Sequence, residues 1–140
     1  MSLEINAQAP GAAALQILLY PLVHVHDTLW ADEELRNFRF IGRVACQYIA
    51  RSLGDEALPS LLDLDLAVAP PTIVAGGGPM DPVRSDVKAF VDALRRAGVD
   101  VAERKYPALM HGGLNFTAYS KIATNALQDV GVLARERFAR

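Results

Sequence analysis

Two residues of this 140-residue chain, Asp81 and His111, have the types and the spacing of the supporting half of a catalytic triad. Asp81 comes soon after a short apolar segment at residues 72–75, and His111 comes soon after an extended segment at residues 99–106. Their separation of 30 positions is enough for one helix and one strand, which return the chain to the same edge of a parallel sheet. A carboxylate at this place can hold the imidazole in one tautomer and stabilise its charged form. Asp81 and His111 are therefore candidate catalytic residues, with Asp81 able to orient His111 and His111 able to act as a general base. On spacing alone, a helix cap at Asp81 and an ordinary loop position for His111 remain open.

The segments around this pair alternate between strand-like and helix-like patterns. Short apolar runs predict two strands buried on both faces, at residues 15–20 and 72–75. A third strand is predicted at residues 99–106. Apolar residues at steps of three and four predict helices over residues 31–53, 83–97 and 119–140. Because strands alternate with helices, we predict an α/β fold in one domain, residues 1–140, with about three mostly parallel strands and flanking helices.

Two stretches fall outside this alternation. Residues 1–14 are rich in alanine, asparagine, glutamine and proline at their start, and we predict a loose lead-in there. Residues 22–69 contain the helix-like pattern at residues 31–53 followed by a connector rich in proline, leucine and aspartate. We predict that this stretch is a helical insert between the first two strands.

Asp81 also fits a purely structural role. The pair Asp81-Pro82 is typical of a helix start, with the aspartate as N-cap and the proline at the first helical position. A carboxylate can cap a helix and orient a histidine at the same time, so the two roles are compatible. Asp86 is a weaker candidate for the acid, because it would point outward from the first turn of the helix.

Other motifs offer weaker alternatives. His24 and His26, with Asp27 beside them, alternate along an extended segment and therefore face the same way, as two metal ligands would. No third cluster supports a metal site, and an ordinary loop is favoured. The Gly76-Gly-Gly78 string could cradle a phosphate, but neither a Lys-Ser/Thr pair nor the Gly-x-Gly-x-x-Gly spacing accompanies it.

Composition excludes several classes of protein. Hydrophobic residues make up 51% of the chain and charged residues 21%, which is typical of a globular domain. The net charge of -2 argues against nucleic acid as a partner. No apolar stretch is long enough to span a membrane. The N-terminal residues lack a positively charged region followed by a long apolar run, so we expect that they are not a signal peptide. We therefore expect a cytoplasmic protein.

Six segments resemble, in order, one known group of enzymes. They are Leu18-Leu-Tyr-Pro21, Pro70-Pro-Thr72, Asp81-Pro-Val-Arg84, the helix end from Ala93 to Val99, Arg104-Lys-Tyr-Pro107 and His111-Gly112. The chain resembles the C-terminal portion of the hormone-sensitive-lipase-like branch of the α/β-hydrolases, which are esterases and lipases. The resemblance runs from about Leu15 to the C-terminus and implies a partial α/β-hydrolase fold.

The resemblance also implies roles for individual residues. The aspartate of the family's Asp-Pro-Leu-Arg motif is the triad acid and the histidine of its His-Gly-Phe motif is the base, and these positions are Asp81 and His111 here. The implied substrate is a small-molecule ester, with no cofactor and no metal, and residues 22–69 correspond to the family's cap. Val83 and Gly113 depart from the family pattern, and the glycine turn before Asp81 is about one residue longer.

The nucleophile of such an enzyme is missing from the sequence. The strained turn that carries it requires Gly-x-Ser-x-Gly, and no serine of the chain has glycines two positions before and after it. His111-Gly112-Gly113 resembles the family's His-Gly-Gly oxyanion motif in letters only, because it follows the last strand. We therefore predict that the chain alone is inactive.

Two hypotheses about function follow. In the first, the chain is part of a carboxylic-ester hydrolase whose serine lies elsewhere. In the second, it is a non-catalytic remnant that acts as a dimeric or protein-interaction module. The apolar strand from Leu15 to Tyr20 would form an edge with unpaired backbone groups, so we expect a homo-oligomer formed through this edge.

Overall fold

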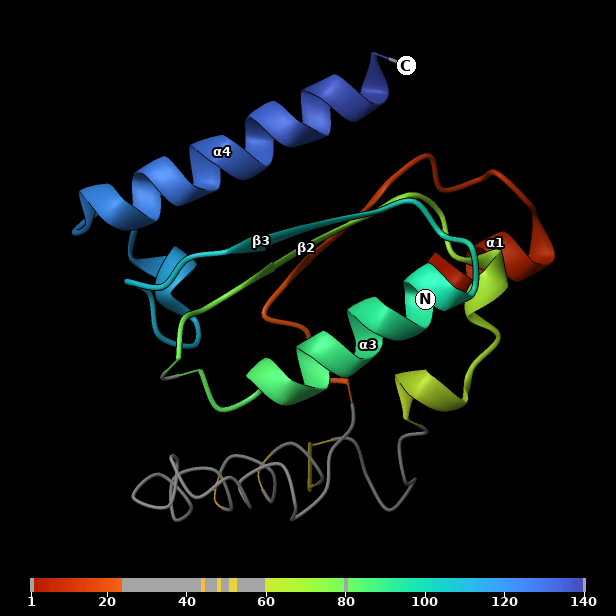
Figure 1. The fold of residues 1–140 in the computed structure, drawn as a ribbon, viewed down its shortest axis with the longest axis horizontal. Coiled ribbons are helices and arrows are strands. Elements are labelled where there is room, and N and C mark those ends of the chain that lie inside the picture. The colour runs from red at the N-terminus through yellow and green to blue at the C-terminus, as the bar shows by residue number, and fades with distance from the viewer. Residues whose placement is uncertain are drawn as a thin grey trace.

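The computed structural model describes residues 2–23, 44, 48, 51, 52, 60–79 and 81–139. Figure 1 shows the elements, which in chain order are α1 (Ser2–Gln8), β1 (Gln16–Leu19), the 3-10 helices η3 (Leu61–Asp63) and η4 (Leu66–Val68), β2 (Thr72–Gly76), α3 (Arg84–Arg96), β3 (Val101–Lys105), the 3-10 helix η5 (Gly113–Phe116) and α4 (Lys121–Phe138). The three predicted strands and the helices at 83–97 and 119–140 are all present, with bounds shifted by a few residues.

The strands form a parallel sheet in the order β1-β2-β3. Ile73 in the central strand is in register with Ile17 on one side and Ala102 on the other. All five residues of β2 are buried, as a strand covered on both faces should be. The predicted α/β class, with three parallel strands and flanking helices, is therefore confirmed.

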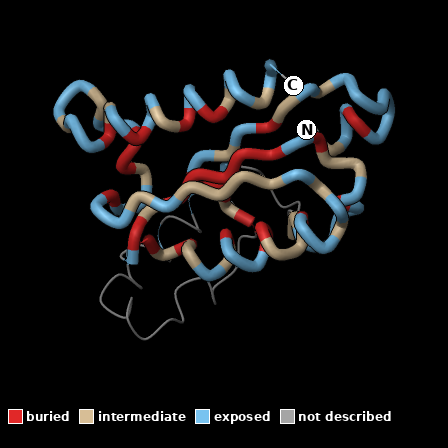
Figure 2. Tube along the Cα trace, turned by 45° about the horizontal axis from the view of Figure 1, so that its top comes forward, coloured by how far each residue is buried: buried red, intermediate tan, exposed pale blue. Residues whose placement is uncertain are grey.

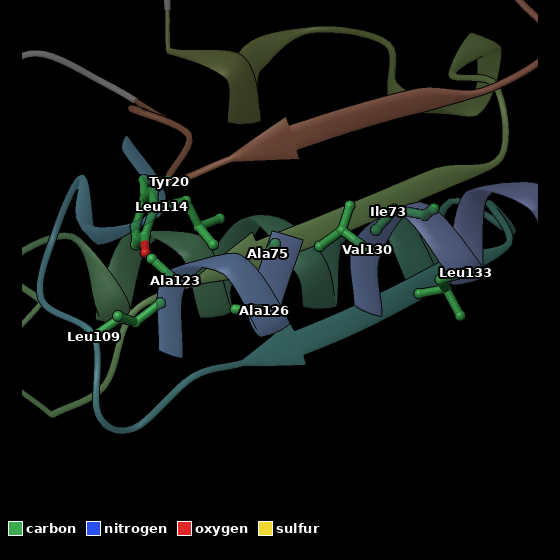
Figure 3. Close-up of a cluster of buried hydrophobic side chains, with 9 residues drawn as sticks. All are labelled: Tyr20, Ile73, Ala75, Leu109, Leu114, Ala123, Ala126, Val130 and Leu133. Atoms are coloured by element: carbon green, nitrogen blue, oxygen red, sulfur yellow. The ribbon is translucent and has the colours of Figure 1, made fainter. Parts of the chain in front are cut away.

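Helices cover both faces of the sheet, with α4 on one side and α3 on the other (Figure 1). The α4-side cluster consists of Tyr20, Ile73, Ala75, Leu109, Leu114, Ala123, Ala126, Val130 and Leu133 (Figure 3). The α3-side clusters consist of Val74, Val83, Val87 and Val91, and of Val23, Leu66, Phe90 and Leu94. Figure 2 shows the buried positions concentrated on the strands and on the helix faces turned toward them.

Ionic contacts fix α4 relative to β3. Asp129 of α4 accepts hydrogen bonds from the Tyr106 hydroxyl at 2.9 Å and from Arg104 Nε at 3.2 Å. Burial, and then the bond to Asp129, raise the pKa of Tyr106 above its usual range. Arg137, near the end of α4, also pairs with Asp100. These contacts hold the helix over the segment that leads into His111.

The predicted loose lead-in is wrong for residues 2–8, which form helix α1. Leu3 packs against the α3-side cluster that contains Phe90 and Leu94. Asn6 is buried, and its side chain accepts a hydrogen bond from the N–H of Ala13 at 2.9 Å. Composition misled here because tertiary contacts, rather than local propensity, order the segment.

The C-terminal helix buries a narrower stripe than its sequence predicts. Tyr119 precedes the helix and is exposed, and Ser120 is the N-cap. Ile122 and Leu127 are also exposed, whereas Ala123, Ala126, Val130 and Leu133 are buried. The buried stripe packs in the α4-side cluster with Ile73 and Ala75 of the sheet, and Ile122 and Leu127 do not belong to it.

Most of the predicted insert at residues 22–69 lies outside the described residues. Residues 44, 48, 51 and 52 are helical, in line with the predicted helix at 31–53, while Cys46, His24, His26 and Asp27 are not described. None of the described helices combines the length and the apolar character that a membrane crossing requires.

Candidate functional site

The structure brings Asp81 and His111 into direct contact. His111 Nδ1 lies 3.0 Å from Asp81 Oδ1, across 30 residues of sequence. The Asp81 side chain is 1% exposed and the His111 side chain is 42% exposed. Asp81 follows β2 and His111 follows β3, so both lie beyond the carboxyl ends of parallel strands, where such sheets gather their functional groups. A buried carboxylate therefore holds a histidine whose ring reaches the surface.

Backbone groups on both sides of Asp81 hold its carboxylate. Oδ2 accepts a hydrogen bond from the N–H of Gly77 at 2.9 Å, and Oδ1 accepts one from the N–H of Val83 at 3.1 Å. Burial is the largest effect on the pKa of Asp81 and raises it. The hydrogen bonds from His111, Val83 and Gly77 together outweigh burial and leave the pKa below its ordinary value of 3.8. Asp81 is therefore ionised under neutral conditions.

The predicted N-cap role of Asp81 is not what the structure has. Helix α3 begins at Arg84, its N-cap is Val83, and Val83 makes no side-chain cap bond. Asp81 stands two residues before Val83. Its carboxylate accepts hydrogen bonds from Gly77, in the turn before it, and from Val83, the N-cap residue. The carboxylate that meets His111 is that of Asp81, while Asp86 lies in the first turn of α3.

The glycine turn after β2 allows the two loops of the site to approach closely. The N–H of Gly78 donates to the carbonyl of Leu109 at 2.8 Å, which ties this turn to the loop that carries His111. A Cβ on Gly78 would lie 2.2 Å from the carbonyl oxygen of Pro107, and one on Gly77 would lie 2.8 Å from Asp81 Oδ2. The longer turn therefore does not carry Asp81 away from His111, because its glycines pack directly against the histidine loop.

These hydrogen bonds also weigh against a phosphate site at the glycine string. The N–H groups of Gly77 and Gly78 are already bonded to Asp81 and to Leu109. A phosphate cradle would need such groups to be available to the ligand. Within the part of the chain that the structure describes, no group of three histidine, cysteine or acidic side chains is arranged to hold a metal ion.

Tyr20 belongs to the surroundings of the site, and sequence reasoning missed it. Its ring centroid lies 5.3 Å from that of His111, with the two planes at 60°. The sequence places it only as the last apolar residue of a buried strand. Its positive φ of 50° is the signal of an unusual role, and that angle is visible only in the structure.

The fold and sequence are similar to those of known proteins. A family model described as alpha/beta hydrolase fold matches residues 1–115. The sequence matches none of the curated proteins compared with it. Similar solved structures include an esterase from the bacterial hormone-sensitive lipase family, with a TM-score of 0.79 and 18% identity over 97% of this chain and 48% of that chain.

Two further solved structures have lower TM-scores. The Pyrobaculum calidifontis esterase has a TM-score of 0.70 and 18% identity over 94% of this chain and 45% of its own. Carboxyl esterase 2 of the mycorrhizal fungus Tuber melanosporum has a TM-score of 0.67 and 21% identity over 93% of this chain and 46% of its own. The chain thus spans about half the length of the solved structures that it matches. Because the family model covers most of the sequence, including Asp81 and His111, the chain belongs to the α/β-hydrolase fold family.

Proposed function

We propose that this chain supplies the acid and the base of a carboxylic-ester hydrolase of the hormone-sensitive-lipase-like branch. The observation that carries the proposal is the 3.0 Å contact between His111 Nδ1 and the buried carboxylate of Asp81. The esterases among the similar structures support the same reaction class.

In this proposal Asp81 orients the imidazole and His111 moves the proton. The ionised carboxylate accepts a hydrogen bond from Nδ1–H, which keeps the proton on Nδ1 and leaves the lone pair on Nε2. Nε2 takes the proton of a serine hydroxyl as that oxygen attacks the ester carbonyl, and it then returns the proton to the departing alcohol. A second cycle with water releases the carboxylic acid. The serine comes from polypeptide outside these 140 residues, because they contain no Gly-x-Ser-x-Gly.

The purified chain should hydrolyse 4-nitrophenyl butyrate no faster than its His111→Ala variant. Without a serine nucleophile the acyl group has no acceptor, so the covalent step does not occur. The measurement is the release of 4-nitrophenolate over time at equal protein concentrations. Robust turnover by the unmodified chain that disappears in the His111→Ala variant would mean that the chain carries its own nucleophile.

The second candidate function is a non-catalytic interaction module. The exposed apolar side chains of strand β1 favour it. Among the described strands β1 pairs with β2, and Ile17 and Leu19 on it are 43% and 42% exposed. A free strand edge with apolar side chains favours pairing with another chain. We propose that two copies associate through the edge from Leu15 to Tyr20.

The DNA directly upstream would distinguish the two candidate functions. An in-frame Gly-x-Ser-x-Gly there would favour the enzyme, and a distant upstream stop codon without such a motif would favour the interaction module.

Replacing Ile17 with lysine should shift the purified chain from an oligomer to a monomer. A charge on a free strand edge opposes strand pairing. Val132→Lys is the matched control, because Val132 is equally exposed, at 43%, but lies on α4. Light scattering coupled to size exclusion measures the mass of each variant. A monomeric unmodified chain, or equal dissociation of both variants, would contradict an interface at this edge.

A further inference from the structure

Tyr20, directly after β1, has a backbone conformation that its residue type disfavours. Its φ is +50°, and among the described residues every other positive φ belongs to a glycine. A left-handed backbone brings the Cβ of an ordinary residue too close to the following carbonyl. Such strain persists only where surrounding contacts enforce it, and it is common at functional sites.

The turn at Tyr20 moves its side chain to the opposite face of the sheet. Residues two apart in a strand point to the same face, so Tyr20 would follow Leu18. Leu18 packs against the α3-side clusters, but Tyr20 is in the α4-side cluster with Ile73 and Ala75. Figure 3 shows Tyr20 and Leu114 at one end of that cluster and Leu133 at the other. The strained turn therefore delivers the ring to the side on which it meets His111.

The Tyr20 hydroxyl group is not what meets His111. Its oxygen is buried, and no described group meets it with full hydrogen-bond geometry. Burial raises the pKa of Tyr20, while hydrogen bonding by the backbone of Leu114 and Gly113 lowers it in part. The specific contact of the side chain is made by its ring, which meets the imidazole at 5.3 Å in an edge-on arrangement. Edge-to-face pairs of this kind are attractive beyond the area that they bury.

We propose that Tyr20 is a positioning residue that holds the His111 ring in the orientation in which Nδ1 meets Asp81. His111 is 42% exposed at its side chain, so solvent alone leaves its ring free to rotate. The contact with the Tyr20 ring and the contact with the Asp81 carboxylate together define one orientation. The description of His111 as the base rests on the proposed function, but the orientation of its ring does not.

The experiment measures the tautomer of His111 in the chain itself and needs no activity. In mildly alkaline buffer, where histidine side chains are ordinarily neutral, imidazole ¹⁵N shifts show which nitrogen carries the proton. The His111 signals are identified by their absence in His111→Gln. We expect the unmodified chain and Tyr20→Phe, which keeps the ring, to hold the proton on Nδ1. Tyr20→Leu should lose that preference and show averaged shifts for the two nitrogens.

Two further variants separate positioning from general damage to the core. Leu133→Ala removes apolar volume from the far end of the same cluster and should leave the tautomer unchanged. Tyr20→Gly accepts the positive φ, so it removes the ring without straining the backbone. It should show the same averaged shifts that are expected of Tyr20→Leu, and it provides the test if the leucine variant does not fold. An unmodified chain without an Nδ1–H preference would overturn the proposal, and so would a ring-deleted variant that keeps it. Either result would leave the ester assay unaffected as a test of the enzyme.

Discussion

Gly78→Ala should destabilise the protein by about 3 kcal/mol and separate the Asp81 loop from the His111 loop. The new Cβ would lie 2.2 Å from the Pro107 carbonyl oxygen and 2.7 Å from the Pro107 carbonyl carbon and Cα. These are backbone atoms, so no side-chain rotation can relieve the overlap, and the two loops must move apart. That movement breaks the hydrogen bond from Gly78 to Leu109 and draws His111 away from Asp81. Urea denaturation measures the stability, and the ¹⁵N shifts of His111 report the contact.

Gly131→Ala is the control for this variant. Gly131 lies inside α4, and a Cβ there would have no atom within 4 Å. Alanine in a helix interior should therefore stabilise the protein, by about 0.5–1 kcal/mol. The two glycine substitutions should thus have opposite signs. Equal stability of both variants would mean that the glycine turn does not hold the two loops together.

Asp81→Asn should lower stability at neutral pH by about 1–3 kcal/mol, because the amide cannot satisfy every donor that the carboxylate satisfies. Gly77, Val83 and His111 all approach its two oxygens. An NH₂ group at either oxygen position faces at least one N–H, so one donor is left without a partner in a buried site. Urea denaturation near pH 7 measures the difference between the two proteins.

The same substitution should also change how stability depends on pH. The pKa of Asp81 is lower in the folded chain than its ordinary 3.8, so in acid the unfolded chain binds its proton first. The stability that the carboxylate contributes is complete above about pH 4–5 and is lost as the pH falls through the folded pKa. The unmodified protein should therefore lose stability more steeply than Asp81→Asn in this acid range, and the two curves should converge at its lower end.

Asp92→Asn provides the comparison. The pKa of Asp92 is also lowered, mainly by its hydrogen bond to Lys88, but this pair lies on the exposed face of α3. Solvent screens such pairs, so the loss of stability should be much smaller than for Asp81→Asn. If the two variants lose the same amount at neutral pH, burial of Asp81 is not what makes its hydrogen bonds important.

The pairing of Asp81 with His111 could be predicted because it depends on chain topology. One helix and one strand separate the two residues, and a parallel connection returns the chain to the same edge of the sheet whatever the details of packing. The glycine turn was harder to interpret. Its extra length is visible in the sequence, but the closeness of Gly78 to Pro107 is a contact between two loops that no local pattern reports.

The alternation of strands and helices, the parallel sheet and the acid–histidine pair could all be predicted from the amino-acid sequence. They follow from periodicity, chain order and spacing, which need no knowledge of side-chain packing. Three features become visible only in the tertiary structure: residues 2–8 form a helix, Asp81 is held by Gly77 and Val83 rather than capping α3, and Tyr20 crosses to the face of His111. The first and third depend on contacts between segments that are distant in sequence or on a strained backbone angle. The bonds to Asp81 are short in sequence, but they depend on the shape of the glycine turn, which packs against the His111 loop. Such contacts override local preference once the core has formed, because their energies exceed the differences in propensity between residues.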